Sequence, residues 1–210
     1  MLNAGVMMPD NGVTEQGYEV QFGINHMGHA LLAKLLRPLL VETARGMGAD
    51  VRVVVLTSDG HALSPAGGVD FDTVKSEQGG LYSVTKYGQS KLANLLFARE
   101  MAERYGGEGV KVVSVHPGRV ATNLAESIAG WNILTRVLVP IVNYSWLVTS
   151  VENGARNQLW AATAEREEVR DGEYYLPVGV VGPDTKFNRD GELARKLWEW
   201  TEGELEGWEV

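Results

Sequence analysis

Tyr87-Gly88-Gln89-Ser90-Lys91 places a tyrosine four residues before a lysine, inside a segment that is predicted to be helical. Side chains at positions i and i+4 lie on the same face of a helix, so the phenol and the ammonium are expected to be neighbours. A nearby ammonium favours the phenolate and lowers the pKa of a phenol from about 10. The stretch therefore predicts a tyrosine that can give and take a proton near neutral pH.

The same spacing occurs a second time in this segment, because Tyr82 and Lys86 also form a Tyr-x-x-x-Lys pair. Spacing alone does not choose between the two tyrosines. The surrounding blocks of sequence are needed for that choice.

Helical and extended segments alternate along the chain, which is typical of a parallel α/β sheet. Leucines between Leu31 and Leu40 recur at helical spacing, and residues 51–56 form a short β-branched run typical of a buried parallel strand. The expected elements are a helix over 19–45, a strand over 51–56, a loop over 64–80, a helix over 81–105, a strand over 110–115, a helix from an N-cap at Ser150 to 164, a strand over 173–178 and a helix from an N-cap at Asp190 to 204.

Five blocks of sequence surround the tyrosine–lysine pair in a fixed order. They are Asn3-Ala4-Gly5-Val6-Met7, Phe22-Gly23-Ile24-Asn25-His26-Met27-Gly28-His29, Val53-Val54-Val55-Leu56-Thr57-Ser58, Tyr87-Gly88-Gln89-Ser90-Lys91-Leu92-Ala93-Asn94, and Ser114-Val115-His116-Pro117-Gly118 with Thr122. Together they resemble the short-chain dehydrogenase/reductase family, and more closely its retinol-dehydrogenase-like branch. The resemblance runs from Asn3 to about Thr122, and it is weaker towards the C-terminus.

The resemblance implies a catalytic set and selects Tyr87 over Tyr82, because the residues after Tyr87 are the ones that match the family. Tyr87 would be the acid/base, and Lys91 would lower its pKa and bind the nicotinamide ribose. Ser58 would donate a hydrogen bond to the substrate carbonyl, and Asn25 would hold a water that links to the lysine. Tyr82 would then be a surface or cap residue. The competing interpretation makes Ser58 the start of a turn and Asn25 a solvent-facing polar residue.

The resemblance also implies a cofactor, NAD or NADP, with NADP the favoured of the two. The corresponding contact residues are Asn3, Ala4, Gly5, Tyr87, Lys91, Pro117, Gly118 and Thr122, although the small ones among them could be ordinary turn residues. Residues 124–148 are rich in apolar side chains and correspond to a substrate-covering segment, which suits a small apolar alcohol or carbonyl. Helices buried in a core or at a dimer face are an equal alternative for that segment.

The implied fold is a doubly wound, Rossmann-like parallel sheet of strand order 3-2-1-4-5-6-7 that lacks its first strands. Family members open with a glycine-rich T-G-x-x-x-G-x-G turn that binds the pyrophosphate, whereas this chain starts at the block that closes the fourth strand. Gly106-Gly107-Glu108-Gly109 follows a helix and precedes a strand, the wrong order for that turn. We therefore expect residues 1–210 to form a single partial dinucleotide-binding and catalytic domain.

Three functions remain open at this stage. The first is an NAD(P)-dependent oxidoreductase acting on an alcohol or carbonyl. The second is a truncated, non-catalytic homologue or incomplete gene model, because a missing pyrophosphate turn predicts weak cofactor binding and self-association through an open sheet edge. The third is a binding or scaffold protein that uses that edge.

The composition of the chain excludes several classes of binding partner and site. The 210 residues carry a formal charge of −8, which argues against a nucleic-acid surface. The chain has no cysteine, so disulfides and thiolate metal sites are excluded. Its longest apolar run, over 133–148, is interrupted by Arg136, Pro140 and Asn143 and is too short to predict a transmembrane helix. His26 and His29 have no third ligand nearby in the sequence, so no metal is expected. We expect a cytoplasmic protein that acts on a small molecule and forms a homo-oligomer.

Overall fold

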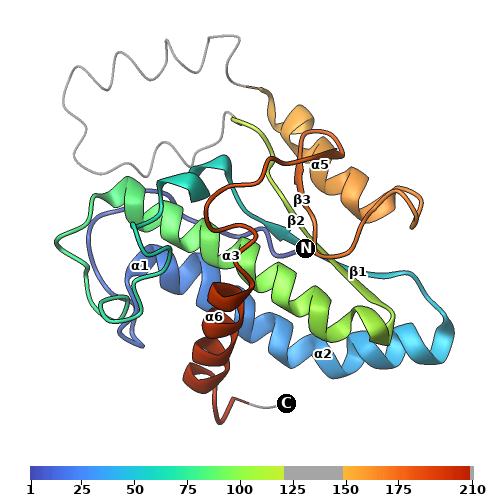
Figure 1. Cartoon of the computed structure of the whole chain (residues 1–210), viewed down its shortest axis with the longest axis horizontal. Helices are drawn as coiled ribbons and strands as arrows, with labels where there is room; N and C mark the ends of the chain where they lie inside the picture. The colour runs from blue at the N-terminus through green and yellow to red at the C-terminus, as the bar shows by residue number, and fades with distance from the viewer. Residues whose placement is uncertain (121–148, 209–210) are drawn as a thin grey trace.

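The computed structural model describes residues 1–120 and 149–208. Its sheet has the strand order β1 (Val51–Leu56), β2 (Val110–Val115), β3 (Tyr174–Leu176) and β4 (Val180–Val181) (Figure 1). β1, β2 and β3 run parallel to one another, and β4 is antiparallel to β3. On the other side of β1, Leu2 forms a parallel bridge to Val55, and the Leu2 amide donates to the Val54 carbonyl at 2.8 Å.

Three longer helices lie on one face of the sheet or pack against that layer. They are α2 (Gly28–Met47), α3 (Ser83–Tyr105) and α6 (Gly191–Glu204). The larger core forms here, and Leu92, Leu96 and Leu197 are completely buried in it. Phe97 of α3 stacks on Trp198 of α6 with ring centroids 4.9 Å apart, so the outer helix is anchored to α3 by aromatic packing.

The opposite face of the sheet is covered by α5 (Val151–Thr163). Alternate residues of β1 divide between the two layers, because successive side chains of a strand point to opposite faces. Val53 and Val55 belong to the larger core, whereas Val54 and Leu56 pack with Ala161 in a smaller core beneath α5. Burial on both faces explains the nearly continuous β-branched run and confirms the predicted Rossmann-like α/β class.

The helix predicted over 19–45 is present, but it is not regular. A short α1 (Val20–Phe22) leads into a π-helical turn, Gly23–Met27, and α2 continues from Gly28. The turn contains Asn25, one of the residues that the family resemblance selects. π-turns of this kind are frequent at functional sites.

The last strands differ from the prediction in two ways. β3 is shorter than the predicted strand over 173–178, because it ends at Leu176 directly before Pro177, which has no amide to donate to a sheet. β4 was not predicted, and both of its residues, Val180 and Val181, are exposed, so it carries no alternating pattern that the sequence could reveal. The sheet is therefore mixed rather than wholly parallel.

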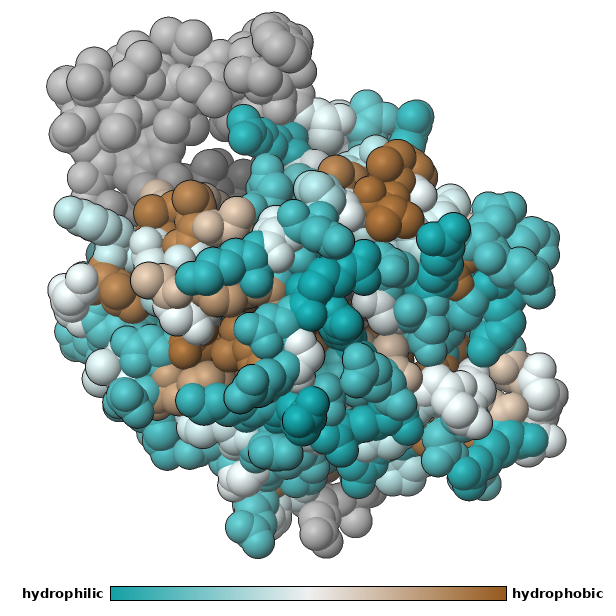
Figure 2. All heavy atoms as spheres, viewed as in Figure 1, coloured by the Kyte–Doolittle hydropathy of each residue, from teal (hydrophilic) through white to brown (hydrophobic). Residues whose placement is uncertain are grey.

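In Figure 2 most of the visible face is hydrophilic, and the hydrophobic residues on it gather in a few separate areas. Within residues 1–120 and 149–208, no helix is long and apolar enough to cross a membrane. Thr122 and the apolar segment 124–148, which the sequence assigned to the cofactor site and to a substrate cover, lie outside the described residues.

Candidate active site

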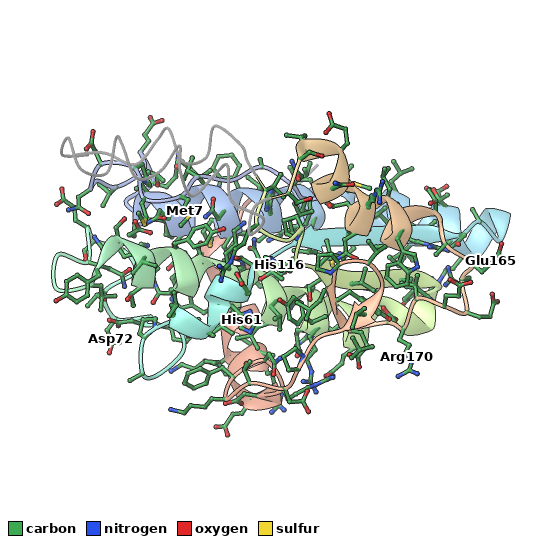
Figure 3. The ribbon with its side chains drawn as sticks, turned by 90° about the horizontal axis from the view of Figure 1, so that it is seen from above. Met7, His61, Asp72, His116, Glu165 and Arg170 are labelled. Atoms are coloured by element: carbon green, nitrogen blue, oxygen red, sulfur yellow. The ribbon has the colours of Figure 1, made fainter. Side chains whose placement is uncertain are left out.

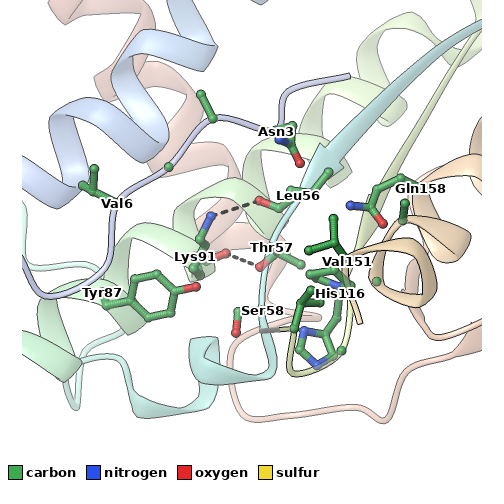
Figure 4. Close-up of a pocket in the computed structure, with 17 residues that line it drawn as sticks. Asn3, Val6, Leu56, Thr57, Ser58, Tyr87, Lys91, His116, Val151 and Gln158 are labelled. Carbon is green, nitrogen blue, oxygen red and sulfur yellow. Dashed lines mark hydrogen bonds between the residues drawn. The ribbon is translucent and has the colours of Figure 1, made fainter. Parts of the chain in front are cut away.

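A cavity of about 650 Å³ lies at the carboxyl ends of β1 and β2, the edge at which open α/β sheets bind ligands (Figure 4). Most of the residues that the sequence predicted for catalysis or cofactor binding line it. They are Asn3, Ala4, Gly5, Ser58, Tyr87, Lys91, Pro117 and Gly118. Residues more than 100 positions apart in the chain thus meet at one place, and Asn25 lies behind them.

The end of β1 is fastened to α3 by hydrogen bonds near the predicted catalytic side chains. The Thr57 hydroxyl donates to the Lys91 carbonyl at 2.6 Å, and the Asn94 side-chain amide donates to the Leu56 carbonyl at 3.0 Å. Both contacts are buried, where exchange with water does not compete. They hold the strand end against the helix turn that carries Lys91 and bring Ser58 to the side of Tyr87.

Gly88 allows α3 to approach the loop after β1 this closely. A Cβ at position 88 would lie 2.7 Å from the Gly60 carbonyl oxygen and 2.9 Å from the Leu63 carbonyl carbon, and both obstacles are backbone atoms. The loop here is a 3₁₀ turn, Asp59–Leu63, and Ser58 caps it by accepting a hydrogen bond from the Gly60 amide at 3.1 Å. The glycine next to Tyr87 therefore has a packing role that spacing arguments do not reveal.

Tyr87 is 8% exposed and its hydroxyl points into the cavity (Figure 4). Burial raises the pKa of its phenol, hydrogen bonding with Ser58 lowers it, and the nearby charge of Asp59 raises it. The net direction is upward, so the predicted lowering of this pKa by Lys91 is wrong for this arrangement. The physical reason is that loss of hydration outweighs the other effects, with the Lys91 ammonium 5.7 Å from the ring centroid.

Lys91 is 6% exposed, and burial lowers the pKa of its ammonium to about 8. Its Nζ donates a long hydrogen bond of 3.5 Å to the Leu56 carbonyl. A Cβ added at Gly5 would lie only 3.4 Å from this Nζ, so the N-terminal segment passes directly over the lysine. Lys91 is thus a poorly hydrated cation at the cavity wall, placed to donate to a polar ligand.

Asn25 is completely buried, which excludes the solvent-facing interpretation. Its Oδ1 accepts from the Val6 amide at 2.7 Å, and its Nδ2 donates to the Val6 carbonyl and to the Ser90 hydroxyl, both at 2.9 Å. The π-turn therefore joins the N-terminal segment to α3 beside the Tyr87–Lys91 pair. These contacts hold the N-terminal segment and α3 together, while the part of Asn25 in a proton path stays a prediction.

Two histidines, His61 and His116, lie at the cavity end of the molecule. His116 lines the cavity, and Figure 3 shows that it and His61 lie near each other from different loops. The Asp59 amide donates to His116 Nδ1 at 3.4 Å, and His61 Nδ1 contacts the Ser58 carbonyl at 2.7 Å. Burial lowers the pKa of both imidazoles. A histidine directly before Pro117-Gly118 was the only sequence signal for His116.

His26 is a packing residue, as its surroundings show. The ring lies edge-on to Phe22 and Phe97, and Nε2 is 3.0 Å from the Thr201 hydroxyl. In the part of the chain that the structure describes, no cluster of three or more His, Cys, Asp or Glu side chains could hold a metal ion.

Sequence reasoning missed the α5 side of the cavity. Val151, Gly154, Ala155 and Gln158 line it from this helix. None of them has a titratable side chain or stands in a motif, so the sequence offered no signal beyond the predicted helix itself.

The residues present fit the nicotinamide and ribose half of a dinucleotide. Gly118 has a φ of +84°, a left-handed conformation that suits glycine, and it puts bare backbone at the cavity wall. Gly5 also puts bare backbone at the cavity, and a Cβ at this position would crowd Asn25 and Lys91. Lys91 and Tyr87 supply polar groups between these walls.

Comparison with known proteins agrees with the site. Residues 73–132 match the short chain dehydrogenase family model. The chain is 35% identical to the short-chain dehydrogenase/reductase drtF of Aspergillus calidoustus, with 97% of this chain and 66% of that protein covered. It is 37% identical to human retinol dehydrogenase 14, with 95% of this chain and 56% of that protein covered. The protein belongs to the short-chain dehydrogenase/reductase family.

Solved structures show the same fold. An uncharacterized protein from Mycobacterium paratuberculosis superposes with a TM-score of 0.68 at 27% identity, over 97% of this chain and 65% of that one. The NADPH-bound carbonyl reductase from chicken fatty liver superposes with a TM-score of 0.57 at 19% identity, over 87% of this chain and 64% of that one. The chain thus spans about 56–66% of the length of these two curated relatives and two structures.

Proposed function

We propose that these 210 residues carry the catalytic groups of an NAD(P)-dependent oxidoreductase that interconverts an alcohol and a carbonyl. The observation that carries this proposal is the meeting of Ser58, Tyr87 and Lys91 in one cavity at the carboxyl edge of the sheet. Asn25 fixes the backbone behind them through Val6 and Ser90. The alternative pair, Tyr82 and Lys86, lies outside the cavity lining.

Each side chain has a role in the direction of carbonyl reduction. A reduced nicotinamide, when bound, supplies the hydride that adds to the carbonyl carbon. Tyr87 gives its phenolic proton to the carbonyl oxygen, which becomes the alcohol hydroxyl. Ser58 donates a hydrogen bond to that oxygen while negative charge develops on it. The ammonium of Lys91 donates to the ribose hydroxyls of the cofactor.

The proposed cofactor is NAD or NADP, with NADP favoured. The chicken carbonyl reductase is NADPH-bound, and a short-chain dehydrogenase from Mycobacterium paratuberculosis, 21% identical with a TM-score of 0.51, is bound to NAD. The proposed substrate is a small apolar alcohol or carbonyl, in keeping with the retinol dehydrogenases among the relatives. A single domain, a cytoplasmic location and a homo-oligomeric state complete the proposal.

A second candidate is a homologue that lacks catalysis. It is favoured by the length comparison, because the chain covers 56% of human retinol dehydrogenase 14. Within the described residues the cavity offers groups for the nicotinamide half of a dinucleotide, but no glycine-rich turn at a helix N-terminus for the pyrophosphate.

The test uses the longest polypeptide that the reading frame encodes around these residues. Carbonyl-dependent oxidation of NADH and of NADPH is followed by absorbance against a panel of aldehydes and ketones of increasing apolar size. The proposal expects turnover with at least one cofactor, and faster turnover with the more apolar substrates. Cofactor that binds without any turnover across the panel would favour the non-catalytic homologue.

A further inference from the structure

The cavity wall formed by residues 116–120 leaves the sheet at a point where regular pairing stops. The His116 amide donates to the Tyr175 carbonyl at 2.9 Å, which is the last bond between the β2 and β3 segments. Pro117 follows and has no amide to continue the ladder. The wall is therefore held after His116 by something other than strand pairing.

Asn157 of α5 spans that point from the reverse face of the sheet. Its Nδ2 donates to the His116 carbonyl at 2.8 Å and to the Tyr175 carbonyl at 3.1 Å, and its Oδ1 accepts from the Gly179 amide at 3.1 Å. The side chain is completely buried. One amide thus connects the ends of two neighbouring strands and the turn that follows β3.

Thr149, just before α5, and Gly154 of α5 hold the far end of the wall. The Thr149 amide donates to the Arg119 carbonyl at 2.7 Å, and Val120 forms a parallel bridge with Thr149. Gly154 lies directly against Val120, because a Cβ at position 154 would meet the Val120 Cγ2 at 2.4 Å. Residues 116–120 are therefore attached at both ends to α5 or to the residues just before it.

We propose that α5 positions the cavity wall His116–Val120 for the nicotinamide end of the cofactor, with Asn157 as the principal positioning residue. The inference rests on the proposed function, because it assigns the wall to that ligand. Asn157 does not line the cavity, whereas His116, Pro117, Gly118 and Val120 do. It acts on the ligand only through the backbone that it fixes.

A purely structural role for Asn157 makes a different prediction. A buried amide that only adds stability would, when removed, weaken the whole fold and leave the native site unchanged. Removal of a positioning residue would loosen one segment of the native state and lower the affinity for the ligand that this segment contacts. Local amide exchange and cofactor affinity separate the two roles, because both are measured on the folded protein.

The experiment compares Asn157→Ala with Asn188→Ala. Asn188 is a matched control, since it is 4% exposed, donates to the Pro183 carbonyl at 2.8 Å and accepts from the Thr185 amide at 2.8 Å, away from the cavity. Hydrogen exchange is measured on the peptide covering 112–120, and affinity for NADH and NADPH is measured by fluorescence titration. Asn157→Ala removes all three hydrogen bonds of this side chain, and it should speed exchange in that peptide and weaken cofactor binding about tenfold. Asn188→Ala should change neither by more than about twofold.

Gly154→Ala provides a second variant that leaves every hydrogen bond of Asn157 in place. The added Cβ should displace Val120. It should therefore speed hydrogen exchange in the same peptide and lower the affinity for the same cofactor. Unchanged exchange over 112–120 in Asn157→Ala, or faster exchange with cofactor affinity intact, would overturn the inference. If the unaltered protein binds neither cofactor, the proposed function fails, and with it the assignment of this wall to nicotinamide, whereas the exchange data still report whether Asn157 fixes the wall.

Discussion

Two Tyr-x-x-x-Lys pairs occupy adjacent turns at the start of α3, and the structure gives them opposite environments. In the first pair Tyr82 is 84% exposed, and Lys86 is 1% exposed with its ammonium bound to Asn11 Oδ1 at 2.9 Å and the Glu77 carbonyl at 2.6 Å. In the second pair Tyr87 and Lys91 are 8% and 6% exposed and line the cavity. Identical spacing therefore gives a buried anchor in one turn and a pair that lines the cavity in the next.

Helix geometry explains the difference. The pairs are five residues apart, and five steps of about 100° leave them rotated by about 140° around the helix axis. Only one of them can then face the end of β1 and Ser58. A spacing motif predicts that two side chains meet, while the face of the helix decides what they meet.

Replacement of Lys86 should give the largest loss of stability. Lys86→Met removes two hydrogen bonds from a buried ammonium and leaves the Glu77 carbonyl without this donor. Hydrogen bonds to charged groups contribute about 1.5–3 kcal/mol each, so the free energy of unfolding should fall by about 3–5 kcal/mol. Urea denaturation at pH 7 measures it. A change below about 1 kcal/mol would show that the first pair is no anchor.

Replacement of Lys91 should change the free energy of unfolding in the opposite direction and stabilise the protein. Burial lowers the pKa of Lys91 from 10.5 to about 8, so the charged form is destabilised in the folded protein. Between those pH values the unfolded chain keeps a proton that the folded chain releases, so the stability of the unaltered protein rises with pH there, and the penalty is complete below pH 8. Lys91→Met should therefore be more stable by about 3 kcal/mol at pH 7, with little gain near pH 11.

The measurement for Lys91 is the difference in unfolding free energy between the two proteins from pH 7 to pH 11. A difference that is constant over this range, or a Lys91→Met variant that is less stable at pH 7, would contradict the description of Lys91 as a poorly hydrated cation. The comparison with Lys86→Met at pH 7 is the sharpest form of the test, because the two substitutions are chemically identical.

A methyl group at Gly88 should give a smaller loss. Gly88→Ala places a Cβ against backbone atoms of Gly60 and Leu63, which cannot move without displacing the loop that carries Ser58. Overpacking of this kind costs about 1–3 kcal/mol, so a loss of about 2 kcal/mol is expected in thermal or urea unfolding. Gly79→Ala is the control, because a Cβ there meets nothing within 4 Å. Equal stability of the two variants would mean that α3 does not approach the loop as closely as described.

The sequence predicted the fold class and most of the site because those features have periodic or spaced signals. The β-branched run of β1 and the order of Asn25, Ser58, Tyr87 and Lys91 are visible without a structure. The π-turn within the helix predicted over 19–45 was not predicted, since propensities do not distinguish one helical hydrogen-bond pattern from another. β4 was missed because two exposed valines carry no pattern.

Two features of the site depend on tertiary packing and could not be predicted. The pKa of Tyr87 rises because burial of the phenol outweighs its hydrogen bond with Ser58, and burial is not visible in a spacing of four residues. Asn157 acts through the carbonyls of His116 and Tyr175, and the backbone of two strands leaves no signature in the sequence of α5. Chemical groups at a site thus show in the sequence more readily than the residues that position its backbone.

The turnover numbers of Tyr87→Phe and Tyr82→Phe, measured side by side with saturating cofactor and carbonyl substrate, test the central claim most directly. Both substitutions remove a single hydroxyl, from an exposed tyrosine at the start of α3 in one case and from a buried tyrosine that lines the cavity in the other. Loss of the acid/base should lower kcat of Tyr87→Phe by about 10²–10⁴-fold and leave Tyr82→Phe within about twofold of the unaltered protein. An inactive Tyr82→Phe beside an active Tyr87→Phe would show that Tyr82 is the acid/base and contradict the account. Full activity of both variants would show that neither tyrosine takes part in the mechanism.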